Sequence, residues 1–418
     1  MAQKHPYRLS AGPPLIIVGA SARAFAQSAR RAGLAVHAAD LFADSDLCAV
    51  AASVARVPAE RYPDGLLDLV APLPAAPWCY TGALENRPDL LERLAAVRPL
   101  AGCSPAAVRL VRDPFRLAAA LREAGLQFPH TCPDPARVPL DGSYVQKPLA
   151  SAAGHGIRRW TADLSAAASA QNQAALIWQK WIEGEAVAAV FLLSDSGADL
   201  LGTSHQLLGK NWCHARGHLY CGSVDVPLPL LAESIRRDWD AVGRLLAETS
   251  GLRGVVGVDA VADRAGRLTV IEVNPRPTAS LELIERRTGR SLAGEHLRAC
   301  GFPVPTPELL SDAAVPASPT SWAKAILRAP HALNVNELLL EKLAFHATDW
   351  RRKDGWPAVA DLPGSGEVIP LGGPVLTLLA PGDGPGAAHL RLIERCVTLS
   401  AALFEPAVLP NEQTLSAD

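Results

Sequence analysis

One predicted β-hairpin, formed by residues 254–276, carries the most informative chemical groups of the chain. If residues 265–266 form its two-residue turn, the paired positions sum to 531, and Asp259 then lies opposite Glu272 with Cβ atoms about 5 Å apart. Asn274 lies on the same face as Glu272 because side chains alternate along a strand. The hairpin is therefore expected to present two acids and an amide together.

Two carboxylates that face each other in an apolar hairpin repel unless a cation lies between them. Asp259, Glu272 and Asn274 therefore predict a metal site, and their oxygen ligands suit Mg²⁺. Arg276 ends the same strand and could meet negative charge that develops during a reaction. The alternative is a solvated polar stripe on an edge hairpin, but the register of the two acids favours the metal. On this view, Glu272→Gln should stabilise the metal-free protein.

A lysine that ends an apolar strand is the second signal. Residues 143–148 form this strand and contain Lys147, and the loop of small residues that follows contains Gly154 and Gly156. A lysine there can reach phosphate oxygens, and glycines let backbone N–H groups approach them. The lysine precedes the loop, so this is not a Walker A motif. A surface lysine before a flexible turn is the alternative.

The third signal is an apolar strand that ends in a polar turn, residues 175–182 followed by Glu185. Backbone groups of such a strand can lie along a purine edge, and the carboxylate can bind ribose hydroxyls. By itself the pattern is equally typical of a core strand.

These segments require a scaffold of at least two modules. Residues 15–18 predict a buried strand that runs into a helix over residues 25–33, and residues 34–40 predict a second strand. Alternating strands and helices indicate a doubly wound parallel α/β sheet over residues 1–105. One helix is expected over residues 106–130, with Ser104 as its cap.

The rest of the chain is expected to be α+β. Residues 106–300 predict an antiparallel sheet around one helix at 231–249 and divide into a small lobe, residues 106–185, and a large lobe, residues 186–300. Beyond residue 301 prolines multiply and short strands are expected at 359–380, which predicts a separate C-terminal module over residues 301–418.

Composition narrows the classes of function. The 418 residues have a formal net charge of -2, so no basic face is available for nucleic acid. The apolar start is too short to span a bilayer, and we expect no membrane partner. Eight cysteines are scattered singly, which indicates reduced thiols in a cytoplasmic protein.

An alternative is a zinc site formed by Cys213, His214, His218 and Cys221. These residues lack a recognised ligand spacing, so a polar substrate-facing loop is favoured. His296 and Cys300, four residues apart on a predicted helix, are expected to be packing residues.

The order of lysine strand, glycine loop, apolar strand and carboxylate hairpin over residues 100–285 resembles the ATP-grasp superfamily. The resemblance implies a pre-ATP-grasp domain at the N-terminus, ATP and Mg²⁺ as cofactors, and carboxylate activation as an acyl phosphate. It implies that Lys147 binds the ATP phosphates and that Gly154 and Gly156 close over them. It also implies that the adenine is held by Gln179, Lys180, Trp181 and Ile182 and the ribose by Glu185. Finally, it implies that Mg²⁺ is bound by Asp259, Glu272 and Asn274 and that Arg276 stabilises the phosphorylated intermediate.

A closer resemblance rests on short motifs at residues 80–86, 205–206, 220–223, 274–280 and 360–363. They are similar to bacterial ATP-grasp proteins of tetrahydromethanopterin-linked one-carbon metabolism, including tyramine-glutamate ligase. The resemblance implies a carboxylate-amine ligase with small-molecule substrates that adds glutamate or a related amino acid, and it leaves a homodimer open. The expected substrate residues are Gly82, Glu85, Asn86, His205 and Ser223.

One departure from the family pattern concerns Pro114. Many members carry a phosphate-binding lysine directly after the aspartate that opens the helix, but here Asp113 is followed by Pro114. Arg112 or Arg116 could substitute. A nucleotide-binding protein without turnover is therefore one alternative, and a biotin-carboxylase-like enzyme, suggested by residues 361–380, is another.

Overall fold

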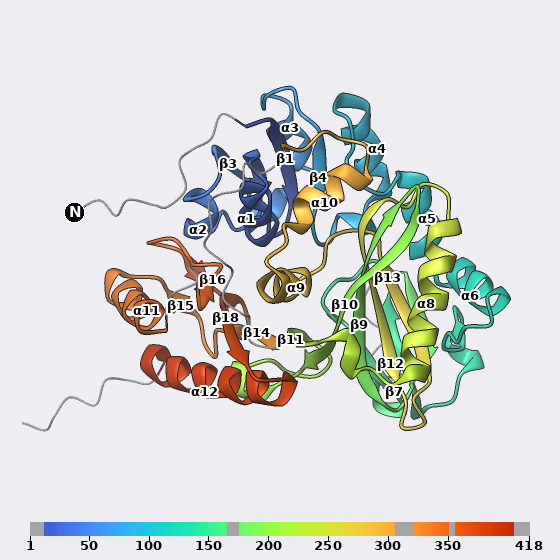
Figure 1. Cartoon of the computed structure of the whole chain (residues 1–418). Helices are drawn as coiled ribbons and strands as arrows, with labels where there is room; N and C mark the ends of the chain where they lie inside the picture. Colours follow the sequence, from blue (N-terminus) through green and yellow to red (C-terminus); the bar gives the residue numbers. More distant parts are fainter. Residues whose placement is uncertain (1–11, 165–174, 306–320, 351–355, 405–418) are drawn as a thin grey trace, which may run out of the picture.

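The computed structural model describes residues 12–164, 175–305, 321–350 and 356–404 (Figure 1). Its N-terminal part is a four-stranded sheet in the order β3-β2-β1-β4, and all three strand pairs are parallel. The strands are β1 Pro14–Gly19, β2 Ala35–Asp40, β3 Ser53–Arg56 and β4 Trp78–Tyr80. The connecting helices are α1 Arg23–Arg31, α2 Ser45–Cys48, α3 Leu66–Val70 and α4 Pro88–Val97, with 3-10 turns at Ala59–Arg61 and Leu84–Asn86. The predicted parallel α/β sheet is confirmed.

The single helix expected over residues 106–130 is two helices, α5 Pro105–Arg112 and α6 Pro114–Glu123. Proline disfavours helical backbone at the preceding residue, and Asp113 is extended, with φ -81° and ψ 110°. The Asp113 carboxylate accepts hydrogen bonds from the N–H groups of Phe115 and Arg116 and so caps α6. The Asp113-Pro114 pair therefore ends α5 at Arg112.

A second, four-stranded antiparallel sheet has the order β5-β8-β6-β7. Its strands are β5 Thr131–Cys132, β6 Asp141–Pro148, β7 Arg158–Thr161 and β8 Leu176–Lys180, and a 3-10 turn lies at Pro135–Arg137. Trp160 and Trp178 are buried between the strands with ring centroids 5.4 Å apart. This small sheet supplies Lys147 from the end of β6.

The largest sheet has eight strands in the order β13-β12-β9-β10-β11-β14-β18-β16. Five come from the large lobe: β9 Glu185–Ser194, β10 Gly197–Leu208, β11 Tyr220–Val226, β12 Gly254–Ala262 and β13 Leu268–Asn274. Three come from the C-terminal part: β14 Ser321–Arg328, β16 Val359–Ala360 and β18 Pro374–Gly382. Because β14 pairs directly with β11, the sheet continues across the boundary expected at residue 300.

Helices cover both faces of the large sheet (Figure 1). Helix α8, Glu233–Glu248, packs on one face through Trp239, whose ring centroid is 6.3 Å from that of Phe191. Helices α9 Leu281–Thr288 and α10 Leu292–Ala299 lie between this sheet and the N-terminal part, where Phe25 of α1 meets His296 of α10 at 5.5 Å. The C-terminal part adds β15 Leu333–Asn334, β17 Val368–Ile369, α11 Glu337–Asp349 and α12 Pro385–Phe404, and short 3-10 turns lie at Asn211–Cys213 and Leu228–Leu230.

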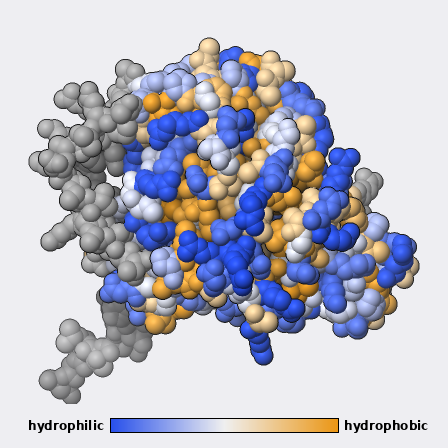
Figure 2. All heavy atoms as spheres, turned by 45° about the vertical axis from the view of Figure 1, so that its right-hand side comes forward, coloured by the Kyte–Doolittle hydropathy of each residue, from blue (hydrophilic) through white to orange (hydrophobic). Residues whose placement is uncertain are grey.

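The surface face in Figure 2 mixes residue types, with hydrophobic residues near the middle of the view between hydrophilic ones. In the described ranges, no helix is both long enough and apolar enough to cross a membrane.

The β12-β13 hairpin has the predicted register at its functional end and a different turn. Asp259 pairs with Glu272, as predicted. The loop has three residues, however, because the N–H of Asp263 donates to the carbonyl of Arg267, and Gly266 takes a positive φ of 73°. A β-bulge leaves Ile271 without a partner on β12 and shifts the register by one residue. The bulge compensates for the longer loop. The predicted two-residue turn is therefore wrong, but the predicted pairing of Asp259 with Glu272 is confirmed.

Candidate active site

Asp259 is held by amides. Its Oδ1 accepts a hydrogen bond from Gln206 Nε2 at 2.8 Å, and its Oδ2 accepts one from Asn274 Nδ2 at 3.0 Å. Burial, with a contribution from the nearby charge of Glu272, raises the pKa of the Asp259 carboxyl to about 6. The contact with Asn274 confirms that this amide lies beside the acid pair.

Glu272 is held by two cations. Lys147 Nζ lies 3.0 Å from its Oε2, and the guanidinium of Arg112 binds its Oε1. Burial tends to raise the pKa of Glu272, but Lys147 and Arg112 outweigh burial and hold it below its ordinary value. The repulsion expected between Asp259 and Glu272 is thus relieved by side chains of the protein, so the pair does not by itself require a metal ion.

The donor set nevertheless fits a hard divalent cation. Asp259, Glu272 and Asn274 bring two carboxylates and an amide oxygen to neighbouring ladder positions, which suits Mg²⁺ with phosphate oxygens and water as further ligands. No group of three or more His, Cys, Asp or Glu residues arranged for a metal occurs among the described residues. Mg²⁺ typically keeps several non-protein ligands, so it needs only a few protein ligands.

Arg276 links the hairpin to the N-terminal part. Its NH2 group donates to Glu85 Oε1 at 2.6 Å and lies 3.4 Å from Asn274 Oδ1, while its NH1 group donates to the carbonyl of Pro277 at 3.1 Å. Burial tends to lower the pKa of Arg276, but Glu85 overcomes this effect and raises it. Arg276 therefore stays charged next to the acid pair.

The N-terminal part brings Gly82, Glu85 and Asn86 close to Arg276 and Arg112. The hydroxyl of Tyr62 donates to the Gly82 carbonyl at 3.2 Å, and Asn86 accepts from Arg112 at 2.8 Å. Glu85 is 1% exposed, and its Oε2 has no hydrogen-bond partner within the described ranges. Such a buried acceptor is costly unless another group binds it.

The glycine loop between β6 and β7 is fixed by close backbone contacts. Gly154 has φ +76°, and an added Cβ would overlap with the carbonyl oxygen of His218. Gly156 has φ +78°, and a Cβ there would lie 2.8 Å from Pro148. Asn86 Nδ2 donates to the Ser151 carbonyl of the same loop at 3.1 Å. The loop therefore lies where the N-terminal part and both sheets meet.

Of the four residues expected to hold adenine, Gln179 lines a small cavity of about 30 Å³, room for roughly one water molecule. Gln179 lines it together with Lys147, Arg112, Pro114 and Glu272. The N–H groups of Lys180 and Trp181 donate to the carbonyls of His130 and Ser143 and are not free for a base. The backbone contribution of these two residues is thereby limited to their carbonyl groups, and Ile182 follows them directly in the chain.

His205 and Ser223, the two other expected substrate residues, differ in position relative to Gln206. His205 is on the sheet face opposite to Gln206, because neighbours on a strand alternate, and its Nδ1 lies 3.3 Å from the Glu185 carboxylate. Ser223 pairs with Gln206 across the ladder and contacts the Tyr220 hydroxyl at 2.8 Å. Gln206, next to His205 in the chain, is the site residue that the sequence prediction missed.

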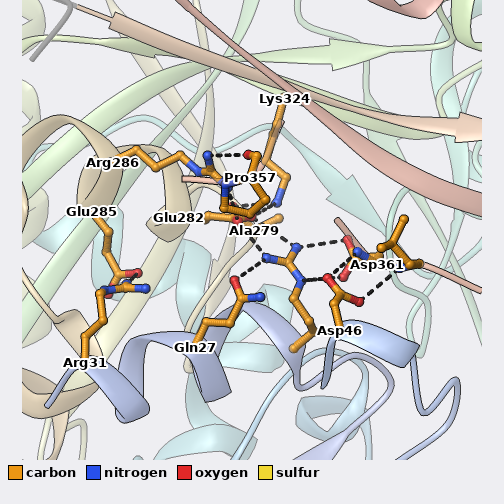
Figure 3. A network of polar contacts seen from close by, with 12 residues as sticks. Gln27, Arg31, Asp46, Ala279, Glu282, Glu285, Arg286, Lys324, Pro357 and Asp361 are labelled. Atoms are coloured by element: carbon orange, nitrogen blue, oxygen red, sulfur yellow. Dashed lines mark hydrogen bonds and ion pairs between the residues drawn. The ribbon is translucent and has the colours of Figure 1, made fainter. Parts of the chain in front are cut away.

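A buried network of charges anchors the loop that carries Arg276 (Figure 3). Lys324 of β14 donates to the carbonyl of Ala279 at 3.3 Å and to Glu282 at 2.9 Å. Arg23 of α1 binds Glu282 at 2.6 Å and Asp361 at 2.8 Å. This network joins the N-terminal part, α9 and the C-terminal strands around the end of the hairpin.

The zinc alternative finds no support. Cys213 and Cys221 are buried in an apolar cluster and donate to the carbonyls of Lys210 and Leu207, while His214 bonds to Ser400 and His218 packs against Trp181. All eight cysteines are free thiols.

His296 is a packing residue, as expected. Its Nδ1 accepts from the N–H of Val255 and its Nε2 bonds to the carbonyl of Ala101, both at 2.9 Å.

Comparisons with known proteins agree with this geometry. Residues 111–280 match the family model described as an ATP-grasp domain. Among solved structures, the ATP complex of carboxyaminoimidazole ribonucleotide synthase from Aspergillus clavatus aligns over 94% of this chain and 99% of that chain, with a TM-score of 0.68 and 15% identity. The ADP complex of PurK, N5-carboxyaminoimidazole ribonucleotide synthetase, aligns over 96% and 100%, with a TM-score of 0.66 and 16% identity.

The biotin carboxylase domain dimer of 2-oxoglutarate carboxylase from Hydrogenobacter thermophilus, in complex with MgADP and bicarbonate, aligns over 91% of this chain and 88% of that chain, with a TM-score of 0.63 and 14% identity. A comparison with curated proteins gives no match. Identities at this level establish the fold, with a parallel N-terminal sheet followed by the antiparallel sheets that carry the site. The segment between residues 111 and 280, which contains Lys147, the glycine loop and the acid pair, is thus similar to an ATP-grasp domain.

Proposed function

We propose that this protein is an ATP-dependent ligase that activates a carboxylate as an acyl phosphate and transfers the acyl group to an amine. One observation carries the proposal: Lys147, Arg276 and the Asp259-Glu272 pair converge from separate segments of an ATP-grasp fold. The solved relatives named above are ligases or carboxylases crystallised with ATP, ADP or MgADP, which supports the same cofactor here. The protein is thus an enzyme that produces ADP.

The proposed chemistry assigns a role to each group. Bound Mg²⁺ would neutralise charge on the phosphates that react. Asp259, Glu272 and Asn274 are placed to hold it, and Lys147 is placed to bind phosphate oxygens. The carboxylate oxygen of the substrate attacks the γ-phosphorus and ADP leaves. The amine nitrogen then attacks the acyl carbon, phosphate leaves, and the amine loses a proton.

Arg276 is placed to stabilise the charge that develops on the phosphorylated intermediate. It is 13% exposed and held by Glu85, so its guanidinium is oriented before the reaction begins. Glu85 Oε2 lies beside it at the carboxyl edge of the parallel sheet, after β4, where open α/β sheets place ligands. We assign this edge, with Gly82 and Asn86, to substrate binding.

The identity of the two substrates is a narrower proposal. The short motifs that resemble tyramine-glutamate ligase support glutamate or a related amino acid as the amine, in the synthesis of a one-carbon cofactor. The similar biotin carboxylase domain was crystallised with bicarbonate, which supports bicarbonate as an alternative substrate. Pro114 favours a second candidate function, nucleotide binding without turnover, because it replaces a family lysine.

The experiment that separates these candidates is ADP release from the purified full chain. Glutamate, bicarbonate and other small carboxylates are each combined with primary amines in the presence of Mg²⁺ and ATP. A ligase releases ADP only when both substrates are present. Tight ADP binding by calorimetry without any ADP release across the panel would support the non-catalytic candidate.

Arg276→Lys tests the catalytic assignment. Lysine retains the charge next to Glu85 but lacks the planar fork, so we expect the rate of ADP release to fall about 10- to 100-fold. The dissociation constant of ADP should change little. A variant with wild-type turnover would remove Arg276 from the chemistry.

A further inference from the structure

We infer that Arg112 binds the phosphate groups of the nucleotide and takes the place of the lysine that Pro114 excludes. This inference rests on the proposed function. Arg112 precedes Asp113, the aspartate that opens helix α6, whereas the lysine of the family pattern follows this aspartate.

The backbone places Arg112 at the site. Helix α5 ends at this residue because Pro114 prevents its continuation, and the side chain extends from the helix end. The guanidinium is 13% exposed, binds Glu272 and donates to Asn86 at 2.8 Å. It lines the same small cavity as Lys147. The two cations therefore border the same space next to Glu272, Arg112 from helix α5 and Lys147 from strand β6.

The charges explain why Arg112 should exchange partners. Arg112 and Lys147 both neutralise a single carboxylate, that of Glu272. When a divalent cation takes this carboxylate as a ligand, the two side chains lose their counter-ion in a partly buried site, which is costly unless an anion replaces it. Phosphate oxygens supply that anion, and the guanidinium fork matches their geometry. The Nε of Arg112 is buried and has no partner within the described ranges.

Arg116, the other candidate, is placed differently. Arg116 lies in the first turn of α6, and its side chain is 69% exposed. Its Nε lies 3.7 Å from the carboxylate of Asp113, which caps the same helix. It is absent from the lining of the cavity. Arg116 therefore serves as a matched control, because it is the same residue type and differs from Arg112 only in its location.

The experiment is calorimetric titration of the full chain with ADP and with adenosine, for the wild type, Arg112→Gln, Arg112→Lys and Arg116→Gln. We expect Arg112→Gln to weaken ADP binding about 10- to 100-fold, as for a lost charge-assisted contact, and to leave adenosine binding unchanged. Arg112→Lys should recover part of the ADP affinity, and Arg116→Gln should bind both ligands like the wild type.

Each outcome decides the inference. ADP binding by Arg112→Gln at wild-type affinity overturns it, and so does an equal loss of adenosine and ADP, which would make Arg112 a support of the pocket. If Arg112→Gln does not fold, the comparison of Arg112→Lys with Arg116→Gln applies the same test, since only the former should weaken ADP alone. A wild-type chain that binds no ADP would instead contradict the proposed function itself.

Discussion

Asp259 and Glu272 face each other but have opposite electrostatic surroundings. Burial and the nearby charge of Glu272 raise the pKa of Asp259 to about 6 although the amide of Asn274 opposes the shift, whereas Lys147 and Arg112 lower the pKa of Glu272 despite its burial. Two acids in one place with separated pKa values are characteristic of functional sites. The difference arises entirely from which side chains reach each carboxylate.

Glu272→Gln tests this asymmetry. The substitution removes an anionic ligand, so Mg²⁺ should bind more weakly and ADP release should fall by at least tenfold. The sequence alone predicts that the metal-free protein becomes more stable. The structure reverses that sign, because Lys147 and Arg112 would lose their shared counter-ion, and we expect a loss of about 1–3 kcal/mol. Urea unfolding without Mg²⁺ measures it, and a more stable variant would contradict the assigned pairing.

His296 gives a prediction of pH dependence away from the site. Burial lowers the pKa of its imidazole to about 4, below the value near 6.5 expected when unfolded. The unfolded chain therefore binds more protons between pH 6.5 and 4, and stability due to His296 is lost as the pH falls through this window, by up to about 3 kcal/mol. His296→Gln should flatten this part of the stability profile. Unfolding measured at several pH values, taken as the difference between variant and wild type, isolates the effect, and parallel profiles would refute it.

At the level of secondary-structure elements, three irregular features position the chemistry. The bulge at Ile271 restores the register that the three-residue loop would otherwise shift. The break at Asp113-Pro114 ends α5 next to the hairpin. The glycine loop is a third such feature, because Gly154 packs directly against the backbone at His218.

Gly154→Ala tests the glycine loop against a matched control. Gly154 and Gly217 both have positive φ, +76° and +60°, so alanine is strained at either position. Only at Gly154 would the Cβ also overlap with another segment, the carbonyl of His218, whereas nothing lies within 4 Å of a Cβ at Gly217. We expect Gly154→Ala to lower ADP affinity and melting temperature clearly more than Gly217→Ala. Equal effects of the two variants would show that positive φ alone matters.

At the scale of the whole molecule, buried ion pairs join the three parts of the chain. Glu282 of α9 binds Arg23 of α1, Arg286 and Lys324 of β14 (Figure 3). Burial would raise its pKa, but Arg23 and Lys324 hold the pKa of Glu282 well below its ordinary value. The C-terminal strands thus fix the helix that follows the Arg276 loop.

Lys324→Met tests this link. The loss of one cation from a buried network typically costs about 3–5 kcal/mol, since the remaining charges stay buried. We expect a loss of this order in urea unfolding and faster hydrogen exchange in α9 and the loop before it. Arg61→Met is the control, because the Arg61-Asp68 pair is exposed and contributes about 0–1 kcal/mol. A Lys324→Met protein as stable as the control would show that the network does not hold the parts together.

Local sequence patterns predicted the parallel N-terminal sheet, the facing positions of Asp259 and Glu272, and the ATP-grasp resemblance of residues 100–285, of which residues 111–280 match the family model. These follow from local patterns: apolar runs, alternation along strands and residue types at fixed spacing. The helical pattern of residues 106–130 gave no sign of the break between α5 and α6, but Pro114 itself indicates such a break.

Which charged side chains meet depends on the tertiary structure. Arg112 lies 160 positions before Glu272 and Glu85 lies 191 before Arg276, and no local pattern links such residues. Whether an acid pair repels, and which arginine reaches the site, depends on contacts between separate elements. The continuation of the large sheet into β14 has the same origin, because strand pairing over long distances is set by packing of the whole chain.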